Sequence, residues 1–240
     1  MFDGNFRDGV DKITEPMGRA LYRVGISADV ITVIGVGMAA ACAAFIATGH
    51  FFTAAVFLAL TGVPDALDGA VAKASGSLGP RGAYFDSVAD RLSDGLLFFG
   101  AAWYFIGTDT PRLAMLPFAV YLAASLVSYQ RAKAESLGFD AKGGLMERAE
   151  RFIVLGIGLL ISPLFTAVLW IMLALTVITV GTRFVKVWKQ ATEVTPQAAA
   201  AHRPARSARA ERVRARKEAR AASMGEFRSM ARERMTGFRR

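Results

Sequence analysis

The sequence contains few of the side chains that build disulfides and zinc sites. Among its 240 residues there is one cysteine, Cys42, and there are two histidines, His50 and His202. A single cysteine cannot form an intramolecular disulfide, and neither histidine has a partner at zinc-ligand spacing. The sequence therefore excludes a disulfide-stapled domain and argues against a zinc-binding module.

Charge is missing from several long stretches of the chain. Hydrophobic residues make up 53% of the sequence, and the uncharged stretches of about 20 residues are long enough to cross a bilayer core as helix. These features predict an all-α, polytopic membrane protein with about six transmembrane helices. The predicted spans cover residues 30–48, 51–73, 84–106, 113–133, 148–168 and 167–188.

The first residues predict a different kind of helix. Over residues 5–26, Val10, Ile13, Met17 and Leu21 recur at three- and four-residue spacing, with basic residues between them. This pattern predicts an N-terminal amphipathic helix that lies along the membrane surface. The predicted connections on one side of the membrane are rich in Lys and Arg, so we expect that side and both termini to be cytoplasmic in a multi-pass protein of the cell membrane.

The positive charge of the chain is concentrated near its end. The net charge is +9, and residues 197–240 alone hold 12 Arg and 1 Lys against 4 Glu. We therefore expect a membrane domain over residues 1–189 and a basic cytoplasmic tail over residues 190–240. The tail is either a solvated appendage or a contact for anionic lipid headgroups; nucleic acid is the least favoured partner.

A run of aspartates between residues 65 and 94 is the most informative feature. Asp65 and Asp68 are three residues apart, and Asp86 and Asp90 are four apart, so each pair lies on one helix face. The glycines and proline of residues 76–82 predict a tight reversal, which would bring the two pairs level in an antiparallel hairpin. A carboxylate in a membrane helix costs free energy unless it is paired or bound, so these four are interpreted as functional.

Four converging carboxylates repel one another, and a divalent cation relieves that repulsion. Their hard oxygen ligands favour Mg²⁺ or Mn²⁺ over zinc. Two ions would suit phosphoryl transfer, because they can clamp the attacking and the leaving oxygen. The four aspartates are therefore the predicted metal ligands. A fifth acid, Asp94, could orient a ligand or pair with Arg91 or Lys133.

The same stretch resembles a known signature. It reads Asp65-x2-Asp68-Gly69-x2-Ala72-Lys73-x8-Gly82-x3-Asp86-x3-Asp90, which resembles the signature of the CDP-alcohol phosphatidyltransferases. Seven of the eight fixed positions match. The eighth is Lys73, where the family usually has arginine, so the charge is kept but the planar bidentate donor is not. The resemblance extends over about residues 5–188.

This resemblance implies a six-helix membrane fold, usually homodimeric, with a cavity open to the cytoplasm. The implied reaction moves a phosphatidyl group from CDP-diacylglycerol to a small alcohol and releases CMP. Asp65, Asp68 and Asp86 would coordinate metal. Asp90 would both touch metal and act as the catalytic general base on the acceptor hydroxyl. The residues implied around the CDP moiety are Gly69, Ala72, Lys73 and Gly82.

Further details resemble one subgroup, the phosphatidylinositol phosphate synthases of actinobacterial type. They are the segments 27–35, 128–138 and 143–151, together with Arg183 in the last span. In that subgroup, basic residues on the later helices bind the phosphate of inositol phosphate. Arginines at these positions would equally hold glycerol 3-phosphate, and residues 131–151 could instead be a positive-inside loop. The basic residues expected at the phosphate of the acceptor are Arg131, Lys133, Arg148, Arg151 and Arg183.

Two other classes of function compete with a transferase. An ion or proton transporter also places acids in membrane helices, but this sequence has no internal repeat of the transporter kind. A membrane scaffold that binds through its basic tail would account for the tail alone. The phosphatidyltransferase hypothesis is preferred, because it explains the aspartates, their spacing, the reversal and the basic residues together.

Overall fold

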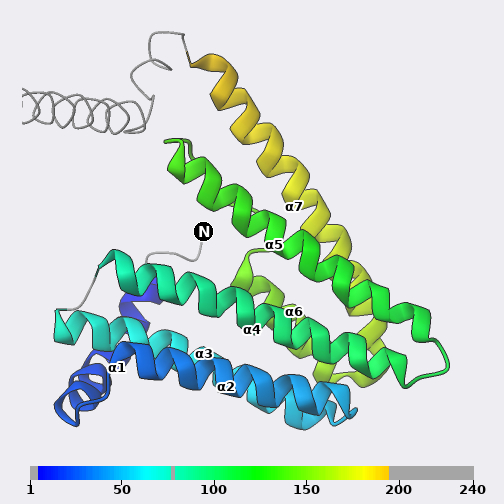
Figure 1. Ribbon diagram of the computed structural model, residues 1–240, viewed down its shortest axis with the longest axis horizontal. Helices are drawn as coiled ribbons and strands as arrows, with labels where there is room; N and C mark the ends of the chain where they lie inside the picture. Colours follow the sequence, from blue (N-terminus) through cyan, green and yellow to red (C-terminus); the bar gives the residue numbers. More distant parts are fainter. Residues whose placement is uncertain (1–4, 77–78, 195–240) are drawn as a thin grey trace, which may run out of the picture. The chain divides into compact units, whose positions relative to one another are not determined.

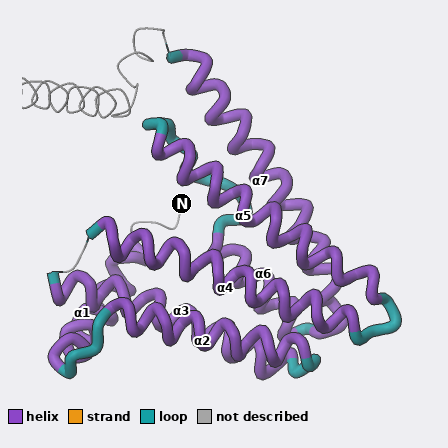
Figure 2. Tube along the Cα trace, in the orientation of Figure 1, coloured by secondary structure: helices purple, strands orange, loops and turns teal. Residues whose placement is uncertain are grey.

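The computed structural model describes residues 5–76 and 79–194, with side chains from Thr14 onward, and these residues form helices and turns without any strand (Figures 1 and 2). The predicted all-α class is confirmed. The chain divides into two compact units, residues 1–187 and 188–240. The helices are α1 (Asn5–Arg23), α2 (Ala28–Ala47), α3 (Phe51–Ser75), α4 (Pro80–Ile106), η1 (Pro111–Ala114), α5 (Met115–Ser136), α6 (Arg148–Leu160), η2 (Ser162–Leu164) and α7 (Phe165–Glu193).

Four helical segments among the described residues are long and apolar enough to cross a membrane. They are Ala28–Ala47, Phe51–Ser75, Pro111–Ser136 and Ser162–Glu193. The other two predicted spans are not among these four segments, for physical reasons. The span predicted over 84–106 lies in α4, whose N-terminal half carries the charged residues of the aspartate motif. The helix predicted over 148–168 ends at Leu160, and its 13 residues extend about 20 Å, short of a bilayer core of about 30 Å.

The reversal predicted between the aspartate pairs is present. Gly76 caps the end of α3 in the left-handed conformation, with φ of 67°, which a residue without a Cβ adopts at little cost. Pro80 then begins α4 at a position where its missing N–H leaves no helical hydrogen bond unmade. α3 and α4 therefore form the two arms of a helical hairpin.

Small residues let the helices of the first unit approach closely. α2 packs against α3 and α4, α1 packs on α3, and α4 contacts α5. A Cβ added at Gly100 of α4 would lie 2.4 Å from the carbonyl oxygen of Ala43 in α2. A Cβ at Gly18 of α1 would lie 2.7 Å from the backbone of Ala70, beside the aspartate motif of α3. These two contacts hold α1 against α3 and α2 against α4, the two helices that carry the motif.

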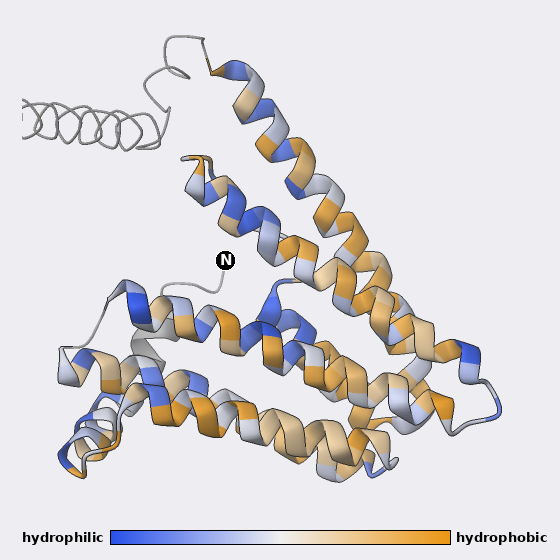
Figure 3. Ribbon diagram, viewed as in Figure 1, coloured by the Kyte–Doolittle hydropathy of each residue, from blue (hydrophilic) through white to orange (hydrophobic). Residues whose placement is uncertain are grey.

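Hydrophilic residues are unevenly distributed along the helices. Figure 3 shows α2 as mostly hydrophobic, whereas hydrophilic residues gather on the C-terminal half of α5 and around the beginning of α6. Of the second unit, the structure describes only residues 188–194, which include the last turn of α7. The basic tail predicted over 190–240, with its lipid contacts, lies almost wholly outside the described residues.

Replacing Gly100 by alanine is expected to destabilise the first unit. The added methyl group would overlap the Ala43 backbone, and overpacking of this kind costs about 1–3 kcal/mol. Thermal unfolding of the purified protein in detergent, followed by loss of the monodisperse size-exclusion peak, measures the change. Gly37→Ala is the matched control, because nothing lies within 4 Å of the Cβ it would add. Equal melting temperatures for the two variants would contradict the close contact.

Candidate active site

The α3–α4 hairpin carries the four signature aspartates, and they lie near enough for their charges to interact. Asp65 and Asp68 project from α3, and Asp86 and Asp90 project from α4. The hydroxyl of Thr32 in α2 donates a hydrogen bond of 3.0 Å to Oδ2 of Asp68. The negative charge of Asp86 acts on both Asp68 and Asp90, and that of Asp65 acts on all three. The result is a concentration of negative charge at the side of the hairpin.

A positive side chain from α6 enters this acidic cluster. Nη1 of Arg148 donates a hydrogen bond to Oδ2 of Asp65 and lies 2.8 Å from Oδ1 of Asp90. Its guanidinium also stands 4.8 Å from the centre of the Phe152 ring. Within the described part of the chain, no three Asp, Glu, His or Cys side chains converge closely enough to hold a metal ion as they stand. The arginine supplies a positive charge to two of the predicted metal ligands.

Asp94 lies one turn beyond Asp90 and is the most buried of these acids, at 1% exposure of its side chain. Its Oδ2 accepts a hydrogen bond of 2.9 Å from Nη2 of Arg151, whose side chain is 2% exposed. Nη1 of Arg91 lies 3.5 Å away from the same oxygen. Of the predicted partners Arg91 and Lys133, Arg91 is confirmed by this ion pair, whereas the closer partner Arg151 was not predicted. The signal for Arg151 was an arginine just inside a predicted membrane span.

A cavity of about 1010 Å³ adjoins the acidic cluster. Its lining comes from α4, α5, α6, α7 and the end of the α5–α6 connection, and it includes Asp86 and Asp90. Asp65 and Asp68 are not among its lining residues, and neither is Lys133, which is exposed on α5. The basic residues in the lining are Arg91, Arg131, Arg148, Arg151 and Arg183, four of which are predicted site residues.

The arginines that line the cavity differ in burial and in how many hydrogen bonds they donate to other protein groups. The guanidinium of Arg131 pairs with Glu135 one turn along α5, at 3.0 Å, and both side chains are about half exposed. Arg183 is buried and is bound on several sides: Nη1 donates to the carbonyl of Val127 at 2.8 Å, and Nη2 donates to Glu147 at 3.0 Å. Arg131 thus faces the cavity as an available donor, whereas Arg183 holds the cavity wall.

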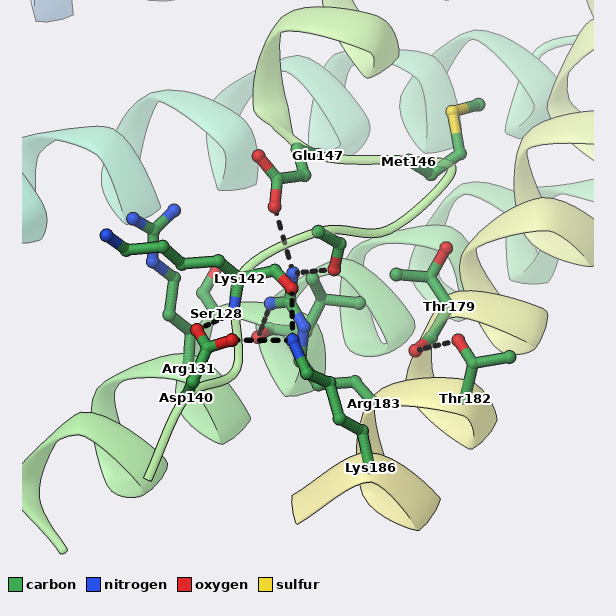
Figure 4. A network of polar contacts seen from close by, with 12 residues as sticks. Ser128, Arg131, Asp140, Lys142, Met146, Glu147, Thr179, Thr182, Arg183 and Lys186 are labelled. Atoms are coloured by element: carbon green, nitrogen blue, oxygen red, sulfur yellow. Dashed lines mark hydrogen bonds and ion pairs between the residues drawn. The ribbon is translucent and has the colours of Figure 1, made fainter. Parts of the chain in front are cut away.

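The connection between α5 and α6, residues 137–147, is fastened to α7 (Figure 4). Nη2 of Arg183 donates to the carbonyl of Gly143 at 2.9 Å. One turn further along, Nζ of Lys186 donates to Asp140 at 2.8 Å and to the carbonyl of Lys142 at 2.9 Å. A Cβ at Gly144 would lie 2.6 Å from Cγ2 of Thr179, so the connection lies directly on the helix.

The hydrogen bond from Lys186 holds the pKa of Asp140 below its usual value of 3.8. A folded-state pKa that is depressed gives a contribution to stability that is present above the unfolded pKa and is lost as the pH falls through the folded pKa. The tie between the connection and α7 is therefore fully formed at neutral pH.

The small residues of the signature leave open space. Nothing lies within 4 Å of a Cβ added at Gly69 or at Gly82. Gly69 is exposed beside Asp68, and Ala72 is half-buried one turn further along α3. Lys73 is exposed near the end of the same helix. The face of the hairpin beside the aspartates can therefore accept a bulky group.

A comparison with protein families gives a match over most of the helical region. The sequence model described as CDP-alcohol phosphatidyltransferase matches residues 26–181. The phosphatidylinositol phosphate synthase of Mycobacteroides abscessus is 34% identical over 186 residues, which are 74% of this chain and 84% of that protein. The archaetidylinositol phosphate synthase of Methanothermobacter thermautotrophicus is 37% identical over 191 residues, which are 77% and 93% of the two chains.

Solved structures give the same result. The crystal structure of Mycobacterium tuberculosis phosphatidylinositol phosphate synthase with CDP-DAG bound matches with a TM-score of 0.70 and 32% identity, covering 74% of this chain and 94% of that one. The structure of the same protein with manganese and citrate matches with a TM-score of 0.69 and 31% identity, covering 73% and 88%. The family resemblance carried by the aspartate motif is thereby confirmed.

Removing the charge of Arg183 is expected to loosen the α5–α6 connection. Arg183→Gln would lose hydrogen bonds from a charged donor, each worth about 1.5–3 kcal/mol. Cleavage of a locally opened segment follows its open population, so trypsin should cut after Lys142 roughly tenfold faster. Site-resolved limited proteolysis read by mass spectrometry measures this. Lys189→Gln removes an exposed charge from the same helix and should leave the rate unchanged; equal rates in both variants would refute the role of Arg183.

Proposed function

The chain belongs to the CDP-alcohol phosphatidyltransferase family, and on that premise we propose that it moves a phosphatidyl group from CDP-diacylglycerol to inositol 1-phosphate and releases CMP. The observation that carries this proposal is the cavity in which Asp86 and Asp90 face a set of arginines. An acceptor that carries a phosphate needs both a base for its hydroxyl and a positive site for its phosphate. The relatives named as inositol phosphate synthases favour this acceptor.

The donor set suits a divalent cation. Four carboxylates from α3 and α4 act electrostatically on one another, and the cluster already draws in a cationic group, that of Arg148. Hard oxygen ligands match Mg²⁺ or Mn²⁺. We propose that Asp65, Asp68, Asp86 and Asp90 would hold two such ions, which supply positive charge to the CDP pyrophosphate and to the leaving phosphate. A relative whose structure contains manganese favours this assignment.

Asp90 is the proposed general base. It lines the cavity from α4, and its side chain is 22% exposed beside Arg148. Its carboxylate would accept the proton of the acceptor hydroxyl as that oxygen bonds to the lipid-side phosphorus. The bond from this phosphorus to the bridging pyrophosphate oxygen then breaks, and CMP leaves with the electron pair. Gly69, Ala72 and Gly82 would leave room for the nucleotide, and Lys73 would lie near its phosphates.

The predicted phosphate ligands would share the acceptor site unequally. Arg131 and Arg148 are the proposed direct ligands, because each presents a partly exposed guanidinium to the cavity. Arg151 and Arg183 are 2% exposed and are held by acidic partners, so they would act by placing the other groups and by raising the positive potential. Lys133 lies outside the cavity lining and would contribute only to that potential.

We also propose how the protein is placed in the cell. α4 would cross the membrane as well, and α6 together with η2, which cover residues 148–164, would complete six membrane helices. Both termini and the cavity mouth would lie on the cytoplasmic side of the cell membrane, by the charge distribution of the connections. The residues around the active site would come from one chain of a homodimer.

The basic tail would contact anionic lipid headgroups. Truncation after Glu193 should then reduce binding to anionic vesicles without abolishing CMP release.

The purified protein, supplied with CDP-diacylglycerol and Mg²⁺, is expected to release CMP when inositol 1-phosphate is the acceptor. Free inositol and glycerol 3-phosphate should give little product, and chelation with EDTA should abolish release. Asp90→Asn should lower the rate by at least about 100-fold, because general-base catalysis contributes roughly 10²–10⁴, while its size-exclusion profile stays native. Release with a different acceptor would discard the assigned substrate, and no release with any acceptor would overturn the proposed reaction.

Arg131→Gln is expected to weaken acceptor binding selectively. Loss of one charged hydrogen bond of about 1.5–3 kcal/mol should raise the KM for inositol 1-phosphate by roughly tenfold or more. The KM for CDP-diacylglycerol should change little, because Arg131 belongs to α5 and not to the α3–α4 hairpin that carries the signature. Steady-state CMP release at varied acceptor measures both constants, with Arg112→Gln on η1 as the charge-matched control. A rise in the KM for CDP-diacylglycerol alone would contradict the assignment of Arg131 to the acceptor.

A further inference from the structure

Arg148 occupies oxygens that the proposed reaction needs for metal. Its Nη1 bonds Asp65 and lies 2.8 Å from Asp90. A guanidinium and a divalent cation cannot share the same carboxylate oxygens closely, because their charges repel. Metal can take these two oxygens only if the Arg148 guanidinium withdraws from them. Its side chain is 23% exposed, and the cavity beside it leaves space for such a movement.

An acceptor for the displaced guanidinium is already in place at Asp94. Oδ2 of Asp94 is taken by Arg151 at 2.9 Å, whereas its Oδ1 is buried without a hydrogen-bond partner. Nε of Arg148 is likewise buried without a partner, and the two atoms lie 3.7 Å apart. A shift of about 1 Å would bring them to hydrogen-bond distance. A buried acceptor and a buried donor without a hydrogen bond are costly, and a second position of the arginine would join them.

We propose that Asp94 is a positioning residue that receives Arg148 when divalent metal binds to the signature aspartates. In the position seen here, Arg148 neutralises Asp65 and Asp90. In the second position its Nε–H donates to Oδ1 of Asp94, so that both signature carboxylates face the metal and the remaining guanidinium faces the cavity. This inference rests on the proposed function and deepens it, because it couples metal binding to the exposure of a phosphate-binding group.

Arg151 makes this arrangement possible by fixing Asp94. It donates from Nη2 to Oδ2 of Asp94 and from Nη1 to the carbonyl of Met146 at 3.1 Å. Asp94 thus has one oxygen held by a buried arginine and one oxygen directed at Arg148. Arg91 adds positive charge at 3.5 Å from the held oxygen and bonds Ser128. Without Arg151, the Asp94 carboxylate would be free to move with Arg148. It would then offer no fixed second site for the guanidinium.

The experiment measures Mn²⁺ binding to the full-length protein in detergent, without substrates, by the electron paramagnetic resonance signal of free Mn²⁺. Arg148→Gln should tighten Mn²⁺ binding by at least about fivefold, because the competing cation is gone. Asp94→Asn should weaken it by at least about fivefold, because Arg148 has lost its second acceptor. The double variant should bind Mn²⁺ within about twofold of Arg148→Gln, because Asp94 acts through Arg148.

The control is Arg131→Gln, which removes the same charge from the same cavity but from an arginine paired with Glu135. It should change Mn²⁺ affinity by less than about twofold, the level of independent sites. If Asp94 only neutralises Arg151, the effects of the two single variants will add in the double variant, and the proposal is overturned. Arg148→Gln alone decides the matter if Asp94→Asn does not fold: unchanged or weaker Mn²⁺ binding sinks the proposal.

The CMP assay separates this inference from the proposed function. If the wild-type protein releases CMP with the acceptor and neither variant changes the Mn²⁺ affinity, only the proposed role of Asp94 is overturned. Wild-type protein that binds no Mn²⁺ would overturn the inference whatever the assay gives. Protein that binds Mn²⁺ as expected and releases no CMP would keep the coupling between Arg148 and Asp94 and would overturn the reaction.

Discussion

The arrangement of this molecule depends on neutralising carboxylates that lie on membrane-length helices. Removing such a group from water is unfavourable unless a positive charge or hydrogen-bond donors replace the water. The α3–α4 hairpin carries five aspartates, two on α3 and three on α4. Two arginines one turn apart on α6 bring the compensating charge, Arg148 to Asp65 and Asp90, and Arg151 to Asp94. The beginning of α6 is therefore fastened to the hairpin by ion pairs.

The same ion pairs divide the arginines into two groups. Arg151 and Arg183 are buried, are held by acids and carbonyls, and build the cavity walls. Arg131 and Arg148 keep part of their guanidinium surface exposed toward the cavity. A phosphate-binding site needs both kinds, because a charge that meets a ligand must move while its surroundings stay fixed. The fastening of the α5–α6 connection to α7 supplies that fixed surrounding.

Much of the candidate site follows from the sequence, and a definable part does not. The four aspartates, their pairing on two helices and the reversal at Gly76 were all predicted from spacing and turn residues. Arg148 was predicted as a phosphate ligand, and its contact with Asp65 was not. Arg183 was predicted at the same site, and its bonds to Val127 and Gly143 were not. Nothing in the type of an arginine distinguishes one that binds a ligand from one that binds a carbonyl.

The sequence by itself determined that the chain is helical, where the hairpin turns and which aspartates share a face. These properties depend on residues three or four apart along one chain, where helix geometry fixes the outcome. Only the tertiary structure decided which arginine meets which aspartate. Arg148 and Asp65 are 83 residues apart, and Arg151 and Asp94 are 57 apart. Their contacts depend on how close the helices approach and at what height they cross, and this is set by packing over the whole unit.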